Sequence, residues 1–145
     1  MIRPMTNEDF KFVSELEKEI FTDAWSLEDF NYELNDNPFA KLWVFEENDE
    51  IIGYLGIWIV FDRAELTTIG LKKEYRGKGL GEKLLLFAIE QAIKEECELM
   101  CLEVRISNEK AISLYEKHSF NKIAIKKNYY KDNHEDAHTM MKGLI

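Results

Sequence analysis

Residues 64–89 have the sequence AELTTIGLKKEYRGKGLGEKLLLFAI. This stretch predicts a β-strand, a glycine-rich loop and a helix, in that order. Ala64 to Leu71 is rich in β-branched and apolar residues between turn signals, which favours a strand. From Gly79 to about Glu95 the apolar residues recur along one helical stripe. Glycines at positions 77, 79 and 81 occupy the junction. A strand followed in this way by a helix and another strand predicts a right-handed parallel crossover, and therefore an α/β fold.

The flanking segments extend this pattern to the whole chain. Before the loop the sequence predicts antiparallel hairpins, and after it strands alternate with helices. The expected strands are Ile2-Arg3, Lys41–Glu46, Glu50–Val60, Ala64–Leu71, Leu99–Val104, Phe120–Asn128 and Ala137–Lys142. The expected helices start at Thr6, at Ser26 (to about Leu34), at Gly79 and at Asn108 (to His118). We therefore predict one domain over residues 1–145, with a mixed, mostly antiparallel sheet, a central parallel strand pair and flanking helices.

The composition is that of an ordinary globular protein with an acidic balance. The 145 residues are 46% apolar and 32% charged, and 28 acidic against 19 basic residues give a net charge of -9. This charge argues against nucleic-acid binding through a basic face. It suits a basic partner such as a cationic peptide, although acidity can also serve solubility alone.

Neither cysteines nor histidines indicate a bridge or a metal site. On one strand, Cys97 and Cys101 would lie about 13 Å apart, beyond the reach of a disulfide. His134 and His138 have a spacing that binds metal only on a helix, and we place His138 on a strand. The N-terminus lacks the apolar segment of a signal peptide, and the longest uncharged run, Ile51 to Phe61, is too short to span a bilayer. We expect a cytoplasmic protein without metal or membrane contacts.

The glycine-rich loop has the chemistry of an anion site. The first turn of a helix presents unpaired backbone amides and a partial positive charge, and glycines let a phosphate approach them closely. A nucleoside-triphosphate loop would need a Lys-Ser or Lys-Thr pair, which is absent here. A dinucleotide fingerprint would need its third glycine one residue later. An anion such as a pyrophosphate remains, with a plain tight turn as the alternative.

Arg-x-x-Gly-x-Gly after a strand and before a helix resembles the acetyl-CoA loop of the GNAT superfamily of N-acetyltransferases. The order of elements also resembles that superfamily over nearly the whole chain. Leu102-Glu103-Val104-Arg105 and Asn128-Tyr129-Tyr130 are similar to segments of its protein N-terminal acetyltransferases, especially those that act on an alanine of ribosomal proteins. Two positions depart from the pattern: Ala24 stands where proline is frequent, and Gly70 where a small residue with a β-carbon is common.

The resemblance implies a role for each site residue. Glu103 would be the general base and Tyr115 the general acid, while Trp25, Tyr129 and Tyr130 would contact the substrate peptide. Strand residues would pair with the pantetheine arm of acetyl-CoA, the loop would hold its pyrophosphate, and Asn108 would bond near the thiol. The residues expected to bind acetyl-CoA are Ile69, Gly70, Leu71, Arg76, Gly77, Lys78, Gly79, Leu80, Gly81, Glu82 and Asn108.

The residues alone leave alternatives for these roles. Glu103 could form an ion pair with Arg105, since side chains two apart on a strand share a face. Tyr115 could be a core tyrosine packed on the sheet, and the three aromatic residues could be ordinary packing.

For the whole chain, the resemblance implies acetylation of the N-terminal α-amine of a basic protein segment, namely an N-terminal alanine of a small-subunit ribosomal protein. The alternatives are a related enzyme that acetylates a small amine or a lysine, and a non-catalytic acyl-CoA-binding module. The last would have no need of Glu103 and Tyr115, so their presence favours an enzyme.

Overall fold

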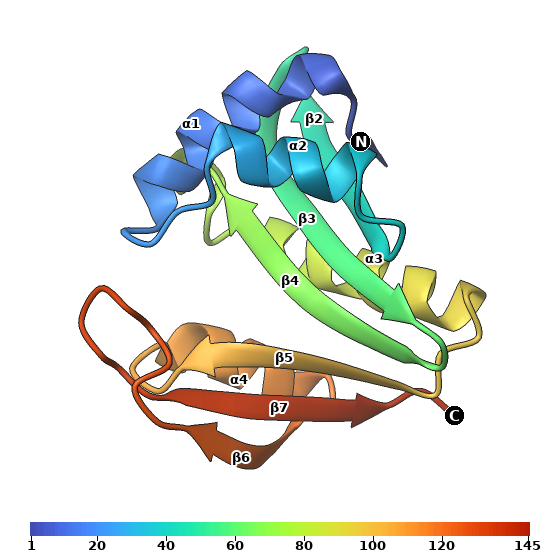
Figure 1. The fold of residues 1–145 in the computed structure, drawn as a ribbon, viewed down its shortest axis with the longest axis vertical. Coiled ribbons are helices and arrows are strands. Elements are labelled where there is room, and N and C mark those ends of the chain that lie inside the picture. Colours follow the sequence, from blue (N-terminus) through green and yellow to red (C-terminus); the bar gives the residue numbers. More distant parts are fainter.

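A twisted seven-stranded sheet runs through the protein in the order β1-β2-β3-β4-β5-β7-β6 (Figure 1). The computed structural model describes residues 1–145. The strands are β1 (Ile2–Pro4), β2 (Ala40–Glu47), β3 (Glu50–Val60), β4 (Arg63–Leu71), β5 (Leu99–Arg105), β6 (Asn121–Lys126) and β7 (Ala137–Gly143). The helices are α1 (Phe10–Ile20), α2 (Leu27–Asn35), α3 (Leu80–Lys94) and α4 (Glu109–Lys117), with 3-10 turns η1 (Asn7–Asp9) and η2 (Lys73–Tyr75). Only the β4–β5 pair is parallel, which confirms the predicted fold class.

The helices lie on two faces of the sheet (Figure 1). On one face α1 and α2 cover β2 to β4, and on the other face α3 and α4 pack against the sheet. Strand β2 shows the alternation behind this arrangement, since Trp43 and Phe45 enter the cluster around α3 while Leu42 and Val44 enter the cluster around α1 and α2. Each such buried side chain contributes about 1.5–3 kcal/mol relative to exposure. No helix covers the face of β5, β7 and β6 that lies on the side of α1 and α2.

Local signals place most of the helix starts. The Asp29 carboxylate accepts a bond from the Ser26 N–H (2.8 Å) while the Asp29 N–H donates to the Ser26 hydroxyl (3.1 Å), which completes the predicted capping box of α2. At Thr6 the chain first makes the 3-10 turn η1 before α1 begins. The turn η2 was not predicted. Strand β6 is shorter than expected: the N–H of Phe120 donates to the carbonyl of Tyr115 (3.0 Å) at the end of α4, and Asn128 has a left-handed φ of 52°.

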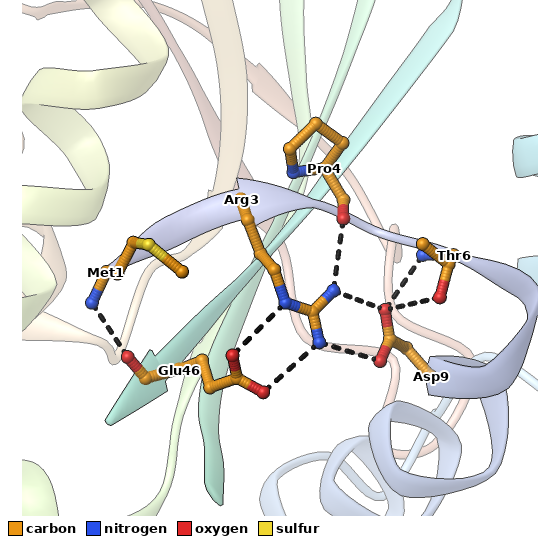
Figure 2. Close-up of polar contacts among 6 residues, drawn as sticks. All are labelled: Met1, Arg3, Pro4, Thr6, Asp9 and Glu46. Atoms are coloured by element: carbon orange, nitrogen blue, oxygen red, sulfur yellow. Dashed lines mark hydrogen bonds and ion pairs between the residues drawn. The ribbon is translucent and has the colours of Figure 1, made fainter. Parts of the chain in front are cut away.

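An arginine ties the N-terminus to the sheet. The Arg3 guanidinium lies between two carboxylates and donates to both Asp9 oxygens (2.8 and 3.0 Å) and to both Glu46 oxygens (3.3 Å each), as Figure 2 shows. The Asp9 carboxylate also accepts bonds from the N–H and the hydroxyl of Thr6. This network joins β1, η1 and β2 at a distance from the cavity described below, which Arg3 does not line.

Candidate active site

The parallel strands β4 and β5 separate after a short paired segment (Figure 1). Residues of both strands line a cavity. Their register holds only from Arg63 opposite Leu99 to Glu65 opposite Cys101. Beyond that point, a cavity of about 920 Å³ opens between the carboxyl halves of the two strands. Ligands of α/β sheets bind at such carboxyl ends. Among the predicted site residues, the cavity is lined by Trp25, Ile69, Gly70, Leu71, Arg76, Glu103, Asn108, Tyr115, Tyr129 and Tyr130.

A β-bulge at Thr67 sets which way the end of β4 faces. Gly56 pairs with Thr68 and Ile57 pairs with Leu66, so Thr67 has no partner of its own. The extra residue reverses the alternation of side chains beyond it. Ala64 and Leu66 belong to the core under α3, yet Thr68 turns toward α1. Gly56, at the register shift in the partner strand, was the sequence signal for this bulge.

A buried carboxylate from α1 lies above this strand end. Glu17 is 2% exposed, and its Oε1 accepts hydrogen bonds from the hydroxyls of Tyr54 (2.5 Å) and Thr68 (3.2 Å). Its Oε2 accepts the backbone N–H of Trp25 (2.8 Å), which fixes the segment between α1 and α2. Burial raises the pKa of Glu17 above its usual value. Sequence reasoning missed Glu17, although its place on the apolar stripe of α1 with Val13 and Ile20 was a usable signal.

The glycine-rich loop presents open backbone amides. Gly77 and Gly79 have left-handed φ values of 76° and 80°, a conformation that favours glycine. The backbone N–H groups from Gly77 to Glu82 donate no hydrogen bond within the protein. Arg76 lines the cavity and donates from Nε to the carbonyl of Leu71 at 3.0 Å, whereas residues 77–82 follow it outside the cavity lining. The loop therefore has the free donors that an anion needs.

The acidic residue at the start of α3 is neutralised by α4. Lys117 Nζ lies 2.8 Å from Glu82 Oε2, and His118 Nε2 lies 3.7 Å from Glu82 Oε1. The hydrogen bond from Lys117 lowers the pKa of Glu82. Glu82 thus stands beside the open amides with its charge compensated, which reduces its repulsion of an anion.

Glu103 lines the cavity and does not form an ion pair with Arg105. Its side chain is 14% exposed, and its closest cation is Lys126, with 3.5 Å between Nζ and Oε2. Arg105 instead bonds Asp132 and Glu135. The alternative of a Glu103–Arg105 ion pair is therefore wrong, and the Glu103 carboxylate remains available at the cavity wall.

Tyr115 and Asn108 reach the cavity from α4. The Tyr115 ring packs against Phe120, with 5.8 Å between centroids, and its hydroxyl has no hydrogen-bond partner in the protein. Burial raises the pKa of Tyr115 to about 12, so its phenol stays protonated at neutral pH. The Asn108 side-chain oxygen accepts the N–H of Ala111 (3.3 Å) as the cap of α4, which leaves its NH₂ group free to donate.

Aromatic residues form the outer walls of the cavity. Trp25 packs on Phe30 with 5.1 Å between ring centroids, and Tyr129 meets Tyr130 edge to face at 5.0 Å. The lining carries carboxylates as well as cations. The carboxylates are Glu17, Asp23, Glu65 and Glu103, and the cations are Arg76, Arg105 and Lys131.

The structure contains no cluster of three or more His, Cys, Asp or Glu side chains that could hold a metal ion. His134 lies in a turn and His138 on β7, so the two histidines do not share a helix. Cys97 and Cys101 are free and buried. None of the helices has the length and apolar character needed to cross a membrane.

Comparisons with known proteins agree with this geometry. The sequence profile of the Acetyltransferase (GNAT) family matches residues 10–120. A Bacillus subtilis protein named as a candidate ribosomal protein bS18-alanine N-acetyltransferase is 44% identical over 136 residues, which cover 94% of this chain and 90% of that protein. The Mycobacterium tuberculosis protein named N-alpha-acetyltransferase RimI is 31% identical over 96% of this chain and 89% of that protein. The crystal structure of the ribosomal-protein-S18-alanine N-acetyltransferase from Escherichia coli has a TM-score of 0.88 at 30% identity, covering 99% of this chain and 93% of that one.

Proposed function

The chain belongs to the GNAT family of acetyltransferases, and we propose that it transfers the acetyl group of acetyl-CoA to the α-amine of the N-terminal alanine of ribosomal protein bS18. The names of its relatives in B. subtilis and E. coli supply the substrate. The observation that carries the chemistry is the meeting of Glu103, from β5, and Tyr115, from α4, at one cavity beside the end of β4.

The open amides of the loop support a coenzyme A site. Backbone donors from Gly77 to Glu82 have no internal acceptor, and the first turn of α3 adds its dipole. The pyrophosphate would bind there, with Arg76 beside it. The pantetheine arm would then lie along Ile69 to Leu71, toward Asn108 and Tyr115.

The side chains in the cavity can perform both proton transfers of acetyl transfer. An α-amine has a pKa near 8, so it loses its proton more readily than a lysine. Glu103 first takes a proton from the α-ammonium group, so that the neutral nitrogen can bond to the thioester carbonyl carbon, and the nitrogen then gives its surplus proton to water. The carbon–sulfur bond then breaks, and Tyr115 gives its phenolic proton to the departing sulfur. With a pKa raised to about 12, Tyr115 holds this proton until the thiolate appears.

The surroundings of the cavity suit a basic peptide. The protein carries a net charge of -9, and four carboxylates line the cavity against three cations. The charge of one of those cations, Arg105, is compensated by Asp132 and Glu135. Opposite charge raises the rate at which a cationic peptide meets this site.

Mass spectrometry of peptides tests this function. A basic peptide that begins with alanine and also contains an internal lysine is incubated with the protein and acetyl-CoA, next to the same peptide with a blocked N-terminus. We expect acetylation of the free N-terminus and none of the blocked peptide. Acetylation of the internal lysine alone would show that the protein is a lysine acetyltransferase instead.

A further inference from the structure

The segment between β6 and β7, residues 127–136, forms one wall of the cavity although it contains no helix or strand. Tyr129, Tyr130 and Lys131 of this segment line the cavity. A segment without regular structure keeps its shape only where specific contacts hold it. Four of these contacts converge on one side chain, Arg105, at the end of β5.

Arg105 binds the segment at four points. Its Nη2 donates to Asp132 (2.9 Å), and its Nη1 donates to Asn133 (3.1 Å) and Glu135 (3.2 Å). The guanidinium carbon lies 3.9 Å from the centroid of the Tyr130 ring, within the range of a cation–π contact. The Arg105 side chain is 22% exposed, so these contacts are partly shielded from solvent.

Two of the residues bound by Arg105, Glu135 and Asp132, also contact other parts of the protein. Glu135 also accepts the backbone N–H of Ser107 at 2.9 Å, which ties the segment to the start of α4. Asp132 also accepts a hydrogen bond from the hydroxyl of Thr22, between α1 and α2. Thr22 lies three residues before Trp25, whose side chain is on the opposite wall. The Arg105–Asp132–Thr22 chain therefore joins the two aromatic walls of the cavity.

We propose that Arg105 is a positioning residue for the peptide substrate, which holds Tyr129 and Tyr130 in place and, through Asp132, couples their segment to the Thr22–Trp25 segment. This proposal rests on the proposed function. Arg105 does not bond Glu103. Arg105 therefore acts on peptide binding by holding the cavity walls in place and not by changing the charge of the base. A groove whose walls are already ordered loses less conformational entropy when a peptide binds.

Replacement of Arg105 by lysine tests the positioning role. Lysine keeps the positive charge but loses the planar fork and the stacking on Tyr130. In Arg105→Lys we expect the KM for an alanine-initiated peptide to rise about tenfold, with kcat and the KM for acetyl-CoA within about twofold of the parent. Thr22→Val, which removes only the exposed contact to Asp132, shifts the peptide KM in the same direction by less.

Arg3→Lys is the matched control. Arg3 also donates to two carboxylates from a part-buried guanidinium, but it does not line the cavity. This variant lowers the melting temperature without changing the peptide KM. If Arg105→Lys behaves like Arg3→Lys, Arg105 is structural only and the proposal is wrong.

Amide hydrogen exchange separates this proposal from the proposed function, because it needs no substrate. Exchange in residues 127–136 becomes faster in Arg105→Lys and in Thr22→Val, while residues 84–92 of α3 keep their rates. Unchanged exchange in residues 127–136 overturns the proposal even if the parent acetylates alanine peptides. A parent that acetylates no alanine peptide overturns the proposed function, and with it the substrate-positioning role, whatever the exchange rates show.

Discussion

The ring of Tyr54 lies so close to the backbone of Gly70 that a Cβ atom at Gly70 would stand 2.5 Å from Tyr54 Oη and Cζ. The two residues are partners across the β3–β4 pair. Tyr54 is fully buried and donates to Glu17, so its ring has little freedom to move away. Glycine at position 70 is therefore a consequence of the tyrosine beside it, and the space of an ordinary small side chain is filled by that ring.

Gly70→Ala should destabilise the fold. The added methyl group forces Tyr54 or the strand to shift, and overpacking of this kind costs about 1–3 kcal/mol. Denaturant unfolding measures the loss. Gly143→Ala is the control, because a Cβ there meets nothing within 4 Å and its φ is not left-handed. Equal unfolding free energies for the two variants would contradict the packing described here.

Glu17 should make the stability depend on pH in an unusual direction. Burial raises the pKa of Glu17 above its ordinary value of 4.5, so the folded state binds this proton more tightly than the unfolded state. The contribution of Glu17 to the unfolding free energy is therefore largest below pH 4.5 and falls as pH rises through the pKa of the folded state. In Glu17→Gln this contribution disappears. The difference in unfolding free energy between parent and variant, followed by denaturation from pH 4 upward, must shrink or change sign as pH rises; a constant difference contradicts the shift.

Tyr115→Phe should lose turnover and keep its cofactor affinity. Removal of a general acid lowers kcat by about 100-fold or more, while the ring continues to pack on Phe120. Because burial raises the pKa of Tyr115 to about 12, this residue adds no basic limb to the pH profile of the parent near neutrality. Steady-state kinetics and calorimetric titration with coenzyme A measure the two effects. Normal turnover in this variant would make Tyr115 a packing residue.

Glu103→Gln should be rescued by alkaline pH. The base is needed only while the substrate amine carries its proton, and the pKa of an α-amine is near 8. The ratio of parent to variant kcat/KM therefore falls between about pH 7 and pH 9. Glu65→Gln, which changes a carboxylate that lines the cavity from β4, is the control and shows no such trend. A ratio for Glu103→Gln that stays constant with pH argues against a general base.

Gly81→Ala should weaken binding of coenzyme A without lowering the stability of the fold. Alanine favours a helix over glycine by about 1 kcal/mol, and a Cβ at this position has open space, so stability is kept or increased. The added methyl group obstructs close approach of a phosphate to the amides of the first turn. We expect the Kd for coenzyme A to rise about tenfold, while a pantetheine without the pyrophosphate binds as before. An equal loss for both ligands would place the pyrophosphate elsewhere.

Much of the framework could be predicted because its signals are local. The capping box of Ser26 and Asp29 lies within four consecutive residues, and the loop from Arg76 to Gly81 carries its own turn and helix-start chemistry. The strand and helix periods extend over single elements. The alternatives that the sequence left open depend on contacts between residues far apart in the chain. Whether Glu103 pairs with Arg105 depended on Asp132 and Glu135, which lie far along the chain.

The sequence by itself determined the order of elements and the parallel crossover at the glycine-rich loop, and it predicts an anion site in that loop. Tertiary structure alone decided where β4 and β5 separate, how the bulge at Thr67 turns the strand end, and which partners Glu17 and Arg105 find. The bond from Tyr54 to Glu17 spans 37 residues and that from Arg105 to Asp132 spans 27. Such contacts depend on how distant segments pack, and no local period or propensity encodes that packing.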